Sequence, residues 1–368
     1  MPLDQWRSST PSDEELKVMQ REVNRIAKPY RTKPDFLWSL CFLARDIVYI
    51  VAYAALISAV KPYVPMALLV PFYSVTMGTI MLGPWVLGHE CGHGAFGATQ
   101  WQNGLVGWLC HSALLVPFWS WAYSHNKHHK YTNHLVLGET HVPNMEGDPV
   151  VGDAFPLLRL IGMHVGFPAY LLGFSRARTQ ADLKTPINRS LLADHFHNGS
   201  QTMPTGDWRI ELSTVGCILW LCVLGWANQY ISIGFWYLGP YLIVNAWLVL
   251  YTWLHHTHPD VPHHGPDVFS FIRGAICTID RPYPWLIDHL HHHIGSTHVA
   301  HHLCSDVPHY RAEKLREELK PVLGKYYLFD PTPMHAAVWE VAHACHHVTS
   351  LDGTQFYRSK DHKVSKSQ

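Results

Sequence analysis

The chain has 368 residues, with 28 Lys and Arg balanced by 28 Asp and Glu, so its formal net charge at pH 7 is zero and only 15% of its residues are charged. This composition excludes a disordered chain, which needs high net charge, and a nucleic-acid-binding protein, which needs a basic excess. Histidine is unusually abundant, with 29 residues, and is the commonest metal ligand in proteins. The eight cysteines form no C-x-x-C pair and lie mostly in apolar stretches, which predicts reduced, buried thiols.

Residues 1–35 predict a cytosolic N-terminal tail. They contain seven Lys and Arg, whereas the loop after the first apolar segment has Lys61 alone. Positively charged flanks stay on the cytosolic side of a membrane, so we expect both chain termini in the cytosol. Residues 1–33 have no apolar core and include Asp13, Glu14 and Glu15, which is not typical of a signal or transit peptide.

Stretches without Asp, Glu, Lys or Arg predict four membrane-spanning helices. Residues 62–88 form one such stretch, and residues 212–259 form one of 48 residues, enough for two helices of about 20 residues each. The predicted spans are 43–60, 66–88, 213–233 and 237–256. Two weaker apolar stretches, 104–123 and 154–174, are interrupted by His, Pro or Arg, so we expect interfacial or re-entrant helices there. Buried helices of a soluble protein are the alternative, but they rarely run this far without a charge.

Histidines cluster where the second and fourth spans end, both on the expected cytosolic side. HECGH (89–93) ends the second span with two imidazoles one helical turn apart, and HHTH (255–258) ends the fourth. HNKHH (125–129) lies between them and HVAHH (298–302) follows. Imidazoles at i, i+3 and i+4 converge on one point, as neighbouring metal ions require. Two further triples of the same spacing end at His293 and His347, so spacing alone does not select the ligands.

Other functions match parts of the same pattern. HECGH also fits the zincin motif H-E-x-x-H, in which two His bind zinc and Glu90 would be the general base of a membrane zinc metalloprotease. A second motif of such proteases would be the aspartate at Asp352, which lies in a polar segment rather than on a membrane helix. Residues 92–97 match G-x-G-x-x-G but follow a helix, unlike a dinucleotide site. A metal transporter would carry ionisable groups within its spans rather than at their ends.

The boxes HECGH, HNKHH and HVAHH, in this order and setting, resemble the membrane fatty acid desaturase family over about residues 36–330. GSTHVAHH at 295–302, followed by PHY at 308–310, is similar to the acyl-lipid Δ12 (omega-6) and omega-3 desaturases. The resemblance implies an all-α membrane protein with four transmembrane helices, one or two interfacial helices and a cytosolic His-rich di-metal domain. Residues 36–330 would form the desaturase domain and 331–368 a cytosolic C-terminal tail.

The resemblance also implies a site and a reaction. Nine histidines would bind two iron ions, namely His89, His93, His125, His128, His129, His256, His298, His301 and His302. The ninth ligand is open between His256 and its neighbours His255 and His258. The implied reaction is O₂-dependent desaturation of 18-carbon acyl chains in lipids of the endoplasmic reticulum membrane, Δ12 desaturation of oleoyl to linoleoyl above all. An omega-3 desaturase, or a hydroxylase, acetylenase or conjugase on the same scaffold, is the alternative.

Further expectations concern residues around this site. The sequence shows no flavin, dinucleotide or haem motif, so electrons are expected from separate cytochrome b5 and its reductase. Four acidic residues beside the boxes are predicted to accept hydrogen bonds from ligand rings: Glu90, Glu139, Asp288 and Asp306. Four tryptophans are predicted to line an acyl channel: Trp85, Trp108, Trp119 and Trp121. The N-glycosylation sequons at Asn188 and Asn198 should remain unmodified, because they follow the second span on the cytosolic side.

Overall fold

The protein is mostly helical in a computed structural model that describes residues 5–139, 142–148, 156–174, 194–198, 200, 203–204 and 206–359. The long helices are α3 (Phe36–Val60), α4 (Met66–Gly92), α8 (Arg209–Ala227) and α9 (Gly239–His256). The other α-helices are α1 (Gln5–Ser8), α2 (Asp13–Ala27), α5 (Gln100–Ser112), α6 (Phe118–Lys130), α7 (Pro156–Leu171), α10 (Phe271–Ala275), α11 (Trp285–Leu290), α12 (His298–Leu303), α13 (His309–Leu323) and α14 (Met334–Ala344). Short elements complete the described fold: η1 (Lys61–Tyr63), η4 (Gly234–Leu238), η5 (Gly324–Tyr326), β1 (Asn144–Met145), β2 (His263–His264), β3 (His347–Val348) and β4 (Thr354–Gln355).

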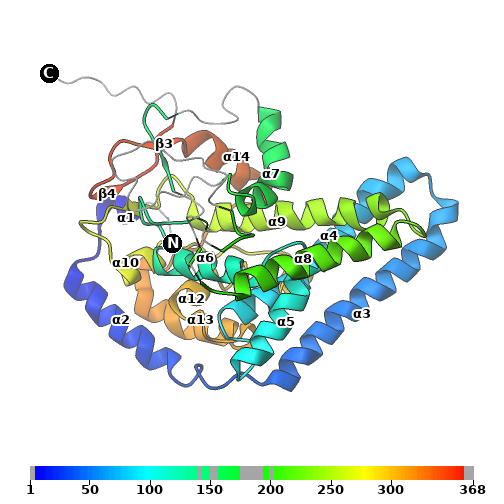
Figure 1. The fold of residues 1–368 in the computed structure, drawn as a ribbon. Coiled ribbons are helices and arrows are strands. Elements are labelled where there is room, and N and C mark those ends of the chain that lie inside the picture. The colour runs from blue at the N-terminus through cyan, green and yellow to red at the C-terminus, as the bar shows by residue number, and fades with distance from the viewer. Residues whose placement is uncertain are drawn as a thin grey trace.

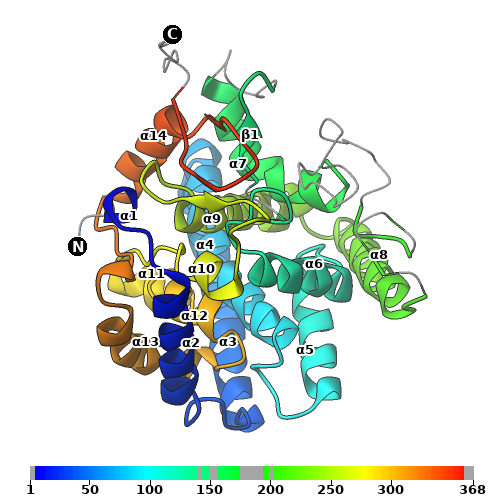
Figure 2. The ribbon, with the colours of Figure 1, turned by 90° about the vertical axis from the view of Figure 1, so that its left-hand side faces the viewer.

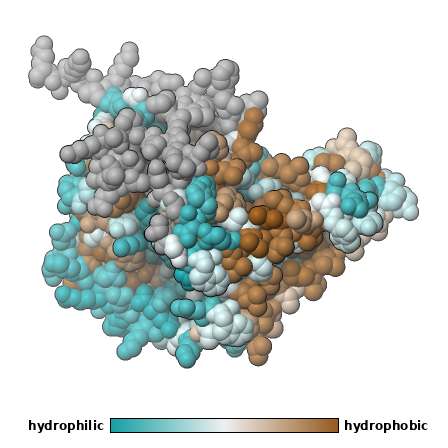
Figure 3. Space-filling model, in the orientation of Figure 1, coloured by the Kyte–Doolittle hydropathy of each residue, from teal (hydrophilic) through white to brown (hydrophobic). Residues whose placement is uncertain are grey.

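Among the residues that the structure describes, four helical segments are long and apolar enough to cross a membrane, in agreement with the four spans predicted from the charge-free stretches. They are Phe36–Tyr63, Met66–Gly92, Arg209–Ala227 and Gly234–His256. The α3–α4 turn and the α8–α9 turn lie at one end of the molecule, so α4 and α9 both end at the other (Figure 1). Apolar surface covers these helices between hydrophilic surface at both ends (Figure 3), as a membrane-spanning region requires.

The first span is longer than predicted. Helix α3 begins at Phe36 rather than at residue 43 and continues through Arg45 and Asp46. The carboxylate of Asp46 is 2% exposed, accepts a hydrogen bond from Arg45 at 2.8 Å, and lies 2.7 Å from Nε2 of His292. Because this charge is paired inside the protein, it does not end the apolar helix. The Asp35 side chain caps α3 at its first turn.

Other predicted segments differ in their bounds. Helix α8 ends at Ala227 rather than at 233, because the Asn228 side chain accepts the N–H of Ile233 at 3.2 Å and closes a turn. The weaker stretch 104–123 is not one helix but is divided between α5 and α6. Leu115 has a φ of 56° and Pro117 precedes α6, so the chain turns sharply between the two helices. The described part of the other weak stretch contains α7, which packs against α9.

The hydrophilic part of the molecule has its own core. Helix α2 runs past α12 and α13 (Figure 2), and its N-terminus is fixed by a capping box of Ser12 and Glu15. Buried side chains of α2, α10, α12 and α13 form one cluster, in which Val299, Ala300 and Leu303 of α12 are at most 2% exposed. Helix α12, which carries the third histidine box, is therefore held on its apolar side by this core.

The residues after 333 pack against the helical body as far as they are described. Helix α14 contacts α9. Strand β3 pairs in parallel with β1, placing His347 opposite Asn144, and β4 pairs antiparallel with β2, placing Gln355 opposite His263. These pairings bring the C-terminal segment close to the ends of α6 and α9.

The eight cysteines are free thiols, as their spacing predicts. Five of them are buried. Cys41 and Cys222 are instead exposed, on the outward faces of the apolar helices α3 and α8. The prediction of buried thiols is therefore correct for the majority and wrong for these two.

Candidate functional site

Histidines from four helices meet at the end of the molecule where α4 and α9 terminate. Helix α4 supplies His89 and is followed by His93, and α9 ends at His256. The other six come from α6 and α12: His125, His128, His129, His298, His301 and His302. Because α4 and α9 end on the same side, residues more than 200 positions apart become neighbours.

The nine predicted ligands form two adjoining groups. In the first group one ring nitrogen from each histidine lies within 4.8 Å of the others: His89, His93, His125, His129 and His301. The second group comprises His128, His256 and His302, and one ring nitrogen from each of them also lies within 4.8 Å of the others. His298 joins it, with its Nε2 3.0 Å from Nε2 of His256. The rings of His129 and His302 stack with their centroids 4.0 Å apart, so the groups share a boundary.

Burial prepares these imidazoles for metal binding. It lowers the pKa of His93 and His298 to about 3 and the pKa of His128 to about 4. The rings are therefore uncharged at neutral pH, which is the form that coordinates a metal. Nε2 of His301 and Nε2 of His302 are buried and have no hydrogen-bond partner among the described residues. Buried polar atoms normally have one, so these nitrogens fit a metal site.

The two remaining histidine triples lie elsewhere. In the triple that ends at His293, His292 contacts Asp46, and His289 lies 3.1 Å from the hydroxyl of Tyr49. In the triple that ends at His347, His343 is exposed and its Nδ1 lies 2.7 Å from the carbonyl of Trp339. Neither triple belongs to the two groups found among the described residues.

The geometry favours His256 over its neighbours as the ninth member. Nε2 of His256 lies 3.2 Å from Nε2 of His128, inside the second group. Nε2 of His255 points instead to the Tyr283 hydroxyl, at 3.0 Å. Nδ1 of His258 accepts the N–H of Asp260 at 3.1 Å. Successive side chains at the end of α9 thus point in different directions.

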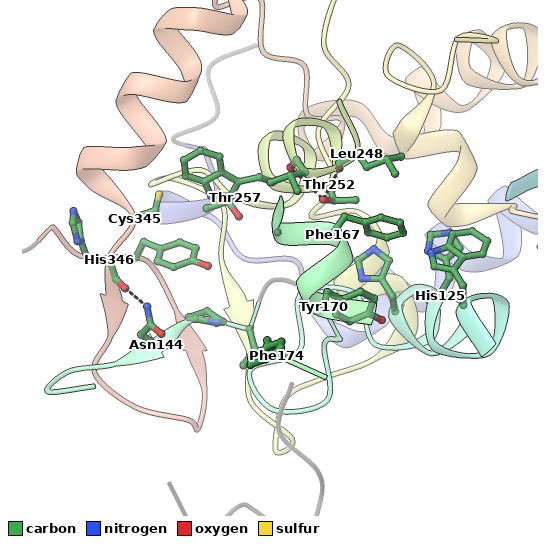
Figure 4. Close-up of a pocket in the computed structure, with 18 of the residues that line it drawn as sticks. His125, Asn144, Phe167, Tyr170, Phe174, Leu248, Thr252, Thr257, Cys345 and His346 are labelled. Atoms are coloured by element: carbon green, nitrogen blue, oxygen red, sulfur yellow. Dashed lines mark hydrogen bonds between the residues drawn. The ribbon is translucent and has the colours of Figure 1, made fainter. Parts of the chain in front are cut away.

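A cavity of about 380 Å³ adjoins the histidine groups. His125 and His128 form part of its wall, as do Trp85 and Trp121. Figure 4 shows Phe167 beside His125 in this wall. A mainly apolar cavity of this size is typical of a site for a small molecule or a part of a larger one. The arrangement can therefore hold an apolar chain beside bound metal.

Comparison with known proteins identifies the family. A sequence profile described as fatty acid desaturase matches residues 65–333. A Delta(12) fatty acid desaturase of Mortierella alpina is 36% identical over 315 residues, which cover 78% of this chain and 76% of that protein. An endoplasmic reticulum omega-6 fatty acid desaturase of Brassica juncea is 35% identical over 342 residues, or 89% and 86% of the two chains. The chain belongs to the fatty acid desaturase family. It is an oxidoreductase, as the three histidine boxes predict.

Relatives of this desaturase include proteins with other named activities. An sn-1 acyl-lipid omega-3 desaturase of Nostoc is 34% identical over 343 residues, covering 89% of this chain and 88% of that protein. An oleate hydroxylase of Claviceps purpurea is 34% identical over 331 residues, covering 78% and 69%. Membership of the family therefore does not by itself fix the reaction.

Thr132 of the desaturase positions one predicted ligand, and no motif marks it. Its hydroxyl lies 3.0 Å from the carbonyl of His128, to which it can donate, and 2.9 Å from Nδ1 of His302. With its hydrogen used on the carbonyl, the hydroxyl accepts the N–H at Nδ1. This leaves Nε2 of His302 as the ligand atom. A hydrogen bond to the other ring nitrogen orients a ligand histidine and raises metal affinity.

We expect the change Thr132→Val to weaken metal binding by about 10- to 100-fold while the fold is kept, because valine has the same shape without the hydroxyl. The measurement is the iron content of purified protein at increasing chelator concentration. Thr132→Ser, which keeps the hydroxyl, is the matched control and should behave as the unmodified enzyme. Equal iron retention by the valine and serine variants would contradict this role.

Asp280 positions the helix that carries the third box. Its Oδ1 accepts the N–H of Val299 at 2.8 Å, next to His298, and its Oδ2 accepts the hydroxyl of Tyr327 at 2.7 Å. The side chain is fully buried, and burial raises its pKa to about 7. Asp280 thus fixes the start of α12, and through it three of the nine histidines.

None of the four acidic residues makes the predicted hydrogen bond to a ligand ring in the interactions described for them. Glu90 comes nearest, with its carboxylate 3.7 Å from Nδ1 of His89, which is too far for a hydrogen bond, and this carboxylate accepts the backbone N–H of His309 at 2.8 Å. Glu139 pairs instead with Lys127 at 2.6 Å, inside the second box. Asp306 pairs with Arg31 at 3.0 Å, and Asp288 lies beside Ser296 and His293. These three carboxylates have other polar neighbours, so they do not orient the predicted ligands.

Two of the four tryptophans predicted to line an acyl channel lie at the cavity beside the histidines, and two do not. Trp85 and Trp121 line the cavity beside the histidines. Trp108 does not, because its indole N–H donates to the carbonyl of Leu212 on α8 at 2.9 Å. Trp119 packs against Phe118 and also lies outside the lining. The Trp108 side chain thus links α5 to α8, and the backbone N–H of Trp119 links α6 to α8 by donating to the Ser213 hydroxyl at 2.9 Å.

Proposed function

We propose that the enzyme desaturates acyl chains of membrane lipids, and that its principal reaction is Δ12 (omega-6) desaturation of oleoyl to linoleoyl. Relatives named as Delta(12) or omega-6 desaturases support this position on the chain. The observation that carries the proposal is the histidine cluster in the wall of a mainly apolar cavity. An acyl chain is apolar, and its reacting carbons need to lie beside the metal site.

We further propose that the nine histidines hold two iron ions, one in each group. Imidazole suits iron, and two adjoining groups of neutral imidazoles suit a dinuclear site. Iron with O₂ supplies an oxidant for unactivated C–H bonds, which no protein side chain can provide.

The chain's own residues prepare the site in separate ways. Burial keeps the imidazoles neutral, so the histidine cluster carries no charge of its own. Thr132 fixes which nitrogen of His302 faces the cluster. Trp85 and Trp121 shape the cavity beside the cluster and give an acyl chain an apolar surface that excludes water. These residues therefore orient the predicted ligands and keep water away from the acyl chain before the reaction.

The electrons are proposed to come from separate cytochrome b5 and its reductase on the cytosolic side. This follows from the sequence, in which no flavin, dinucleotide or haem motif is found. The reaction also consumes O₂, which enters from outside. A membrane preparation lacking cytochrome b5 is therefore expected to be inactive until cytochrome b5 and its reductase are added.

Expression in a eukaryotic host that makes oleate but not linoleate tests the proposed reaction. We expect linoleate to appear in the membrane lipids, with the new double bond at carbon 12, as measured by gas chromatography and mass spectrometry of the methyl esters. A hydroxylated product would instead make the enzyme a hydroxylase, and a bond at carbon 15 of supplied linoleate an omega-3 desaturase. Unchanged oleate in cells that contain the iron-loaded enzyme would refute the proposal.

The two alternatives have specific support. Relatives named as an omega-3 desaturase and an oleate hydroxylase match this chain about as well as the Δ12 relatives do. The zinc metalloprotease hypothesis needs Glu90 as a general base, yet its carboxylate is 2% exposed and accepts the N–H of His309. The desaturase family assignment and the second histidine group also leave that hypothesis without support.

We propose the endoplasmic reticulum membrane as the location, with the histidines and both termini in the cytosol. The basic N-terminal segment and the relative named for the endoplasmic reticulum support this orientation. Glycosylation tests it, because glycosyl transfer occurs in the lumen. Asn198 is half-buried, and its side chain accepts the N–H of Gly206 at 2.8 Å, whereas Asn188 lies outside the described residues.

Both sequons are expected to remain unmodified when the protein is made in such membranes. Treatment with an endoglycosidase should therefore leave its electrophoretic mobility unchanged. A mobility shift that disappears with Asn188→Gln or Asn198→Gln would place the segment after the second box in the lumen. That result would refute the proposed orientation.

A further inference from the structure

One buried histidine beside the cluster is not among the nine predicted ligands. His111 lies near the end of α5, is fully buried, and belongs to neither of the two groups found among the described residues. Its ring lies against α4 at Gly88, where a Cβ atom would clash with Cδ2 and Nε2 of His111. Glycine at this position therefore lets an imidazole from α5 reach the backbone of the helix that carries the first box.

A hydrogen bond fixes the orientation of the His111 ring. Nε2 of His111 lies 3.2 Å from the carbonyl oxygen of Trp85, which can only accept, so Nε2 carries the proton and donates it. Burial lowers the pKa of His111 to about 3, so the ring is uncharged at neutral pH. The backbone of this residue is held as well, because its carbonyl accepts the N–H of Leu114 and the N–H of Val116, both at 2.9 Å.

The His111 ring contacts both tryptophans that line the cavity. It stacks on the indole of Trp85, with ring centroids 5.3 Å apart and planes inclined by 16°, and meets the indole of Trp121 edge-on at 4.7 Å. Each indole in turn stacks on a predicted ligand, Trp85 on His89 at 5.7 Å and Trp121 on His125 at 4.5 Å. The position of the His111 ring therefore affects the cavity wall next to the first histidine group.

This wall has a specific task if an acyl chain lies in the cavity. The methylene groups of such a chain carry no polar atom, so only the shape of the cavity can select one C–H bond among many similar ones. A small displacement of a substrate from its reactive position is enough to change the rate greatly. A change in the tilt of Trp85 or Trp121 would therefore shift the chain relative to the histidines.

We propose that His111 is a positioning residue that determines which carbons of the acyl chain react. Its ring holds Trp85 and Trp121 at fixed angles, and these two side chains hold the chain beside the histidines. His111 itself binds neither the metal ions nor the lipid. The inference rests on the proposed desaturation of acyl chains and names a residue that sets its positional selectivity.

The test compares His111→Gln and His111→Leu with the unmodified enzyme, each expressed at full length in the host that makes oleate. Glutamine keeps an N–H that can donate to the Trp85 carbonyl but has no ring, and leucine has neither. The quantity measured is the ratio of the main product to products modified at other carbons. We expect this ratio to fall by about tenfold in both variants, since discrimination by shape between neighbouring methylene groups is of this size. Iron content should stay equal to that of the unmodified enzyme.

Trp108→Phe is the matched control on the same helix. Its indole N–H donates to the carbonyl of Leu212, and its side chain lies outside the cavity lining, so the variant loses a hydrogen bond of α5 without disturbing the wall. Its product ratio should be unchanged. The ratio is a property of the active molecules, so a lower yield of folded protein does not alter it.

The reference is the main product of the unmodified enzyme, whichever carbon it is modified at. An error in the proposed Δ12 reaction is therefore seen in the unmodified enzyme and is separate from the effect of the variants. An unchanged ratio in the glutamine and leucine variants would overturn the proposal. Loss of iron from them would also overturn it, because His111 would then support the metal site, and so would an iron-loaded variant that makes no product.

Discussion

Replacing His301 by alanine is expected to abolish desaturation, with a loss of more than about 100-fold, and to remove bound iron. The ring of His301 lies among those of His89, His93 and His129, with centroids 4.6 to 4.9 Å away. Its buried Nε2 has no partner among the described residues, as expected of a nitrogen that faces a metal ion. Loss of a supporting residue alone costs 10- to 100-fold, and loss of a ligand should cost more. Activity and iron content are measured on the same purified sample.

The same result is expected for the other eight predicted ligands, and His343→Ala is the matched control. His343 belongs to a triple with identical spacing but is exposed and contacts only the carbonyl of Trp339 in the interactions described for its ring nitrogens. Its alanine variant should keep most of the activity and all of the iron. Full activity of His301→Ala, or loss of iron in His343→Ala, would show that the wrong histidines were chosen.

Replacing Asp280 by alanine is expected to destabilise the hydrophilic part of the enzyme and to remove activity, although Asp280 touches no ligand ring in the bonds described for it. The change leaves the N–H of Val299 and the hydroxyl of Tyr327 without their acceptor, at a cost of about 2 kcal/mol or more. The start of α12 then loosens, and His298, His301 and His302 lose their common orientation. We expect a lower melting temperature, less bound iron and activity reduced by at least about tenfold.

Asp280→Asn is the matched control, because its amide oxygen still accepts from Val299 while its NH₂ group can donate to the oxygen of Tyr327. Burial raises the pKa of Asp280 to about 7, so the neutral form is already accessible in the folded enzyme. The asparagine variant should therefore fold, bind iron and remain active. Similar iron content and melting temperature for the alanine and asparagine variants would contradict the positioning role.

Features with a local signal could be predicted from the sequence. The four spans follow from the absence of charged residues over 47–60, 62–88 and 212–259, the last of which is long enough for two helices. The histidine boxes follow from spacing on a helix, together with their position at the ends of two spans. The structure brings all nine of these histidines together, including His256, which the sequence left open among its neighbours.

Features that depend on distant partners could not be predicted. Helix α3 continues past Arg45 and Asp46 because His292, 246 positions from Asp46, lies against the buried carboxylate. Asp280 and Thr132 carry no motif, and each acts on a box from another part of the chain. The packing of the C-terminal segment against the helical body depends on strand pairings of two residues each, and such short strands leave no periodic pattern in the sequence.

The iron content of the purified enzyme is the most direct test of the central claim, that two groups of histidines form a dinuclear iron site. Metal analysis of protein isolated from membranes under gentle conditions should give about two irons per chain. His301→Ala should contain less iron, and His343→Ala should contain the full amount. One zinc per chain with no iron, in protein that still converts oleoyl lipid, would contradict the account.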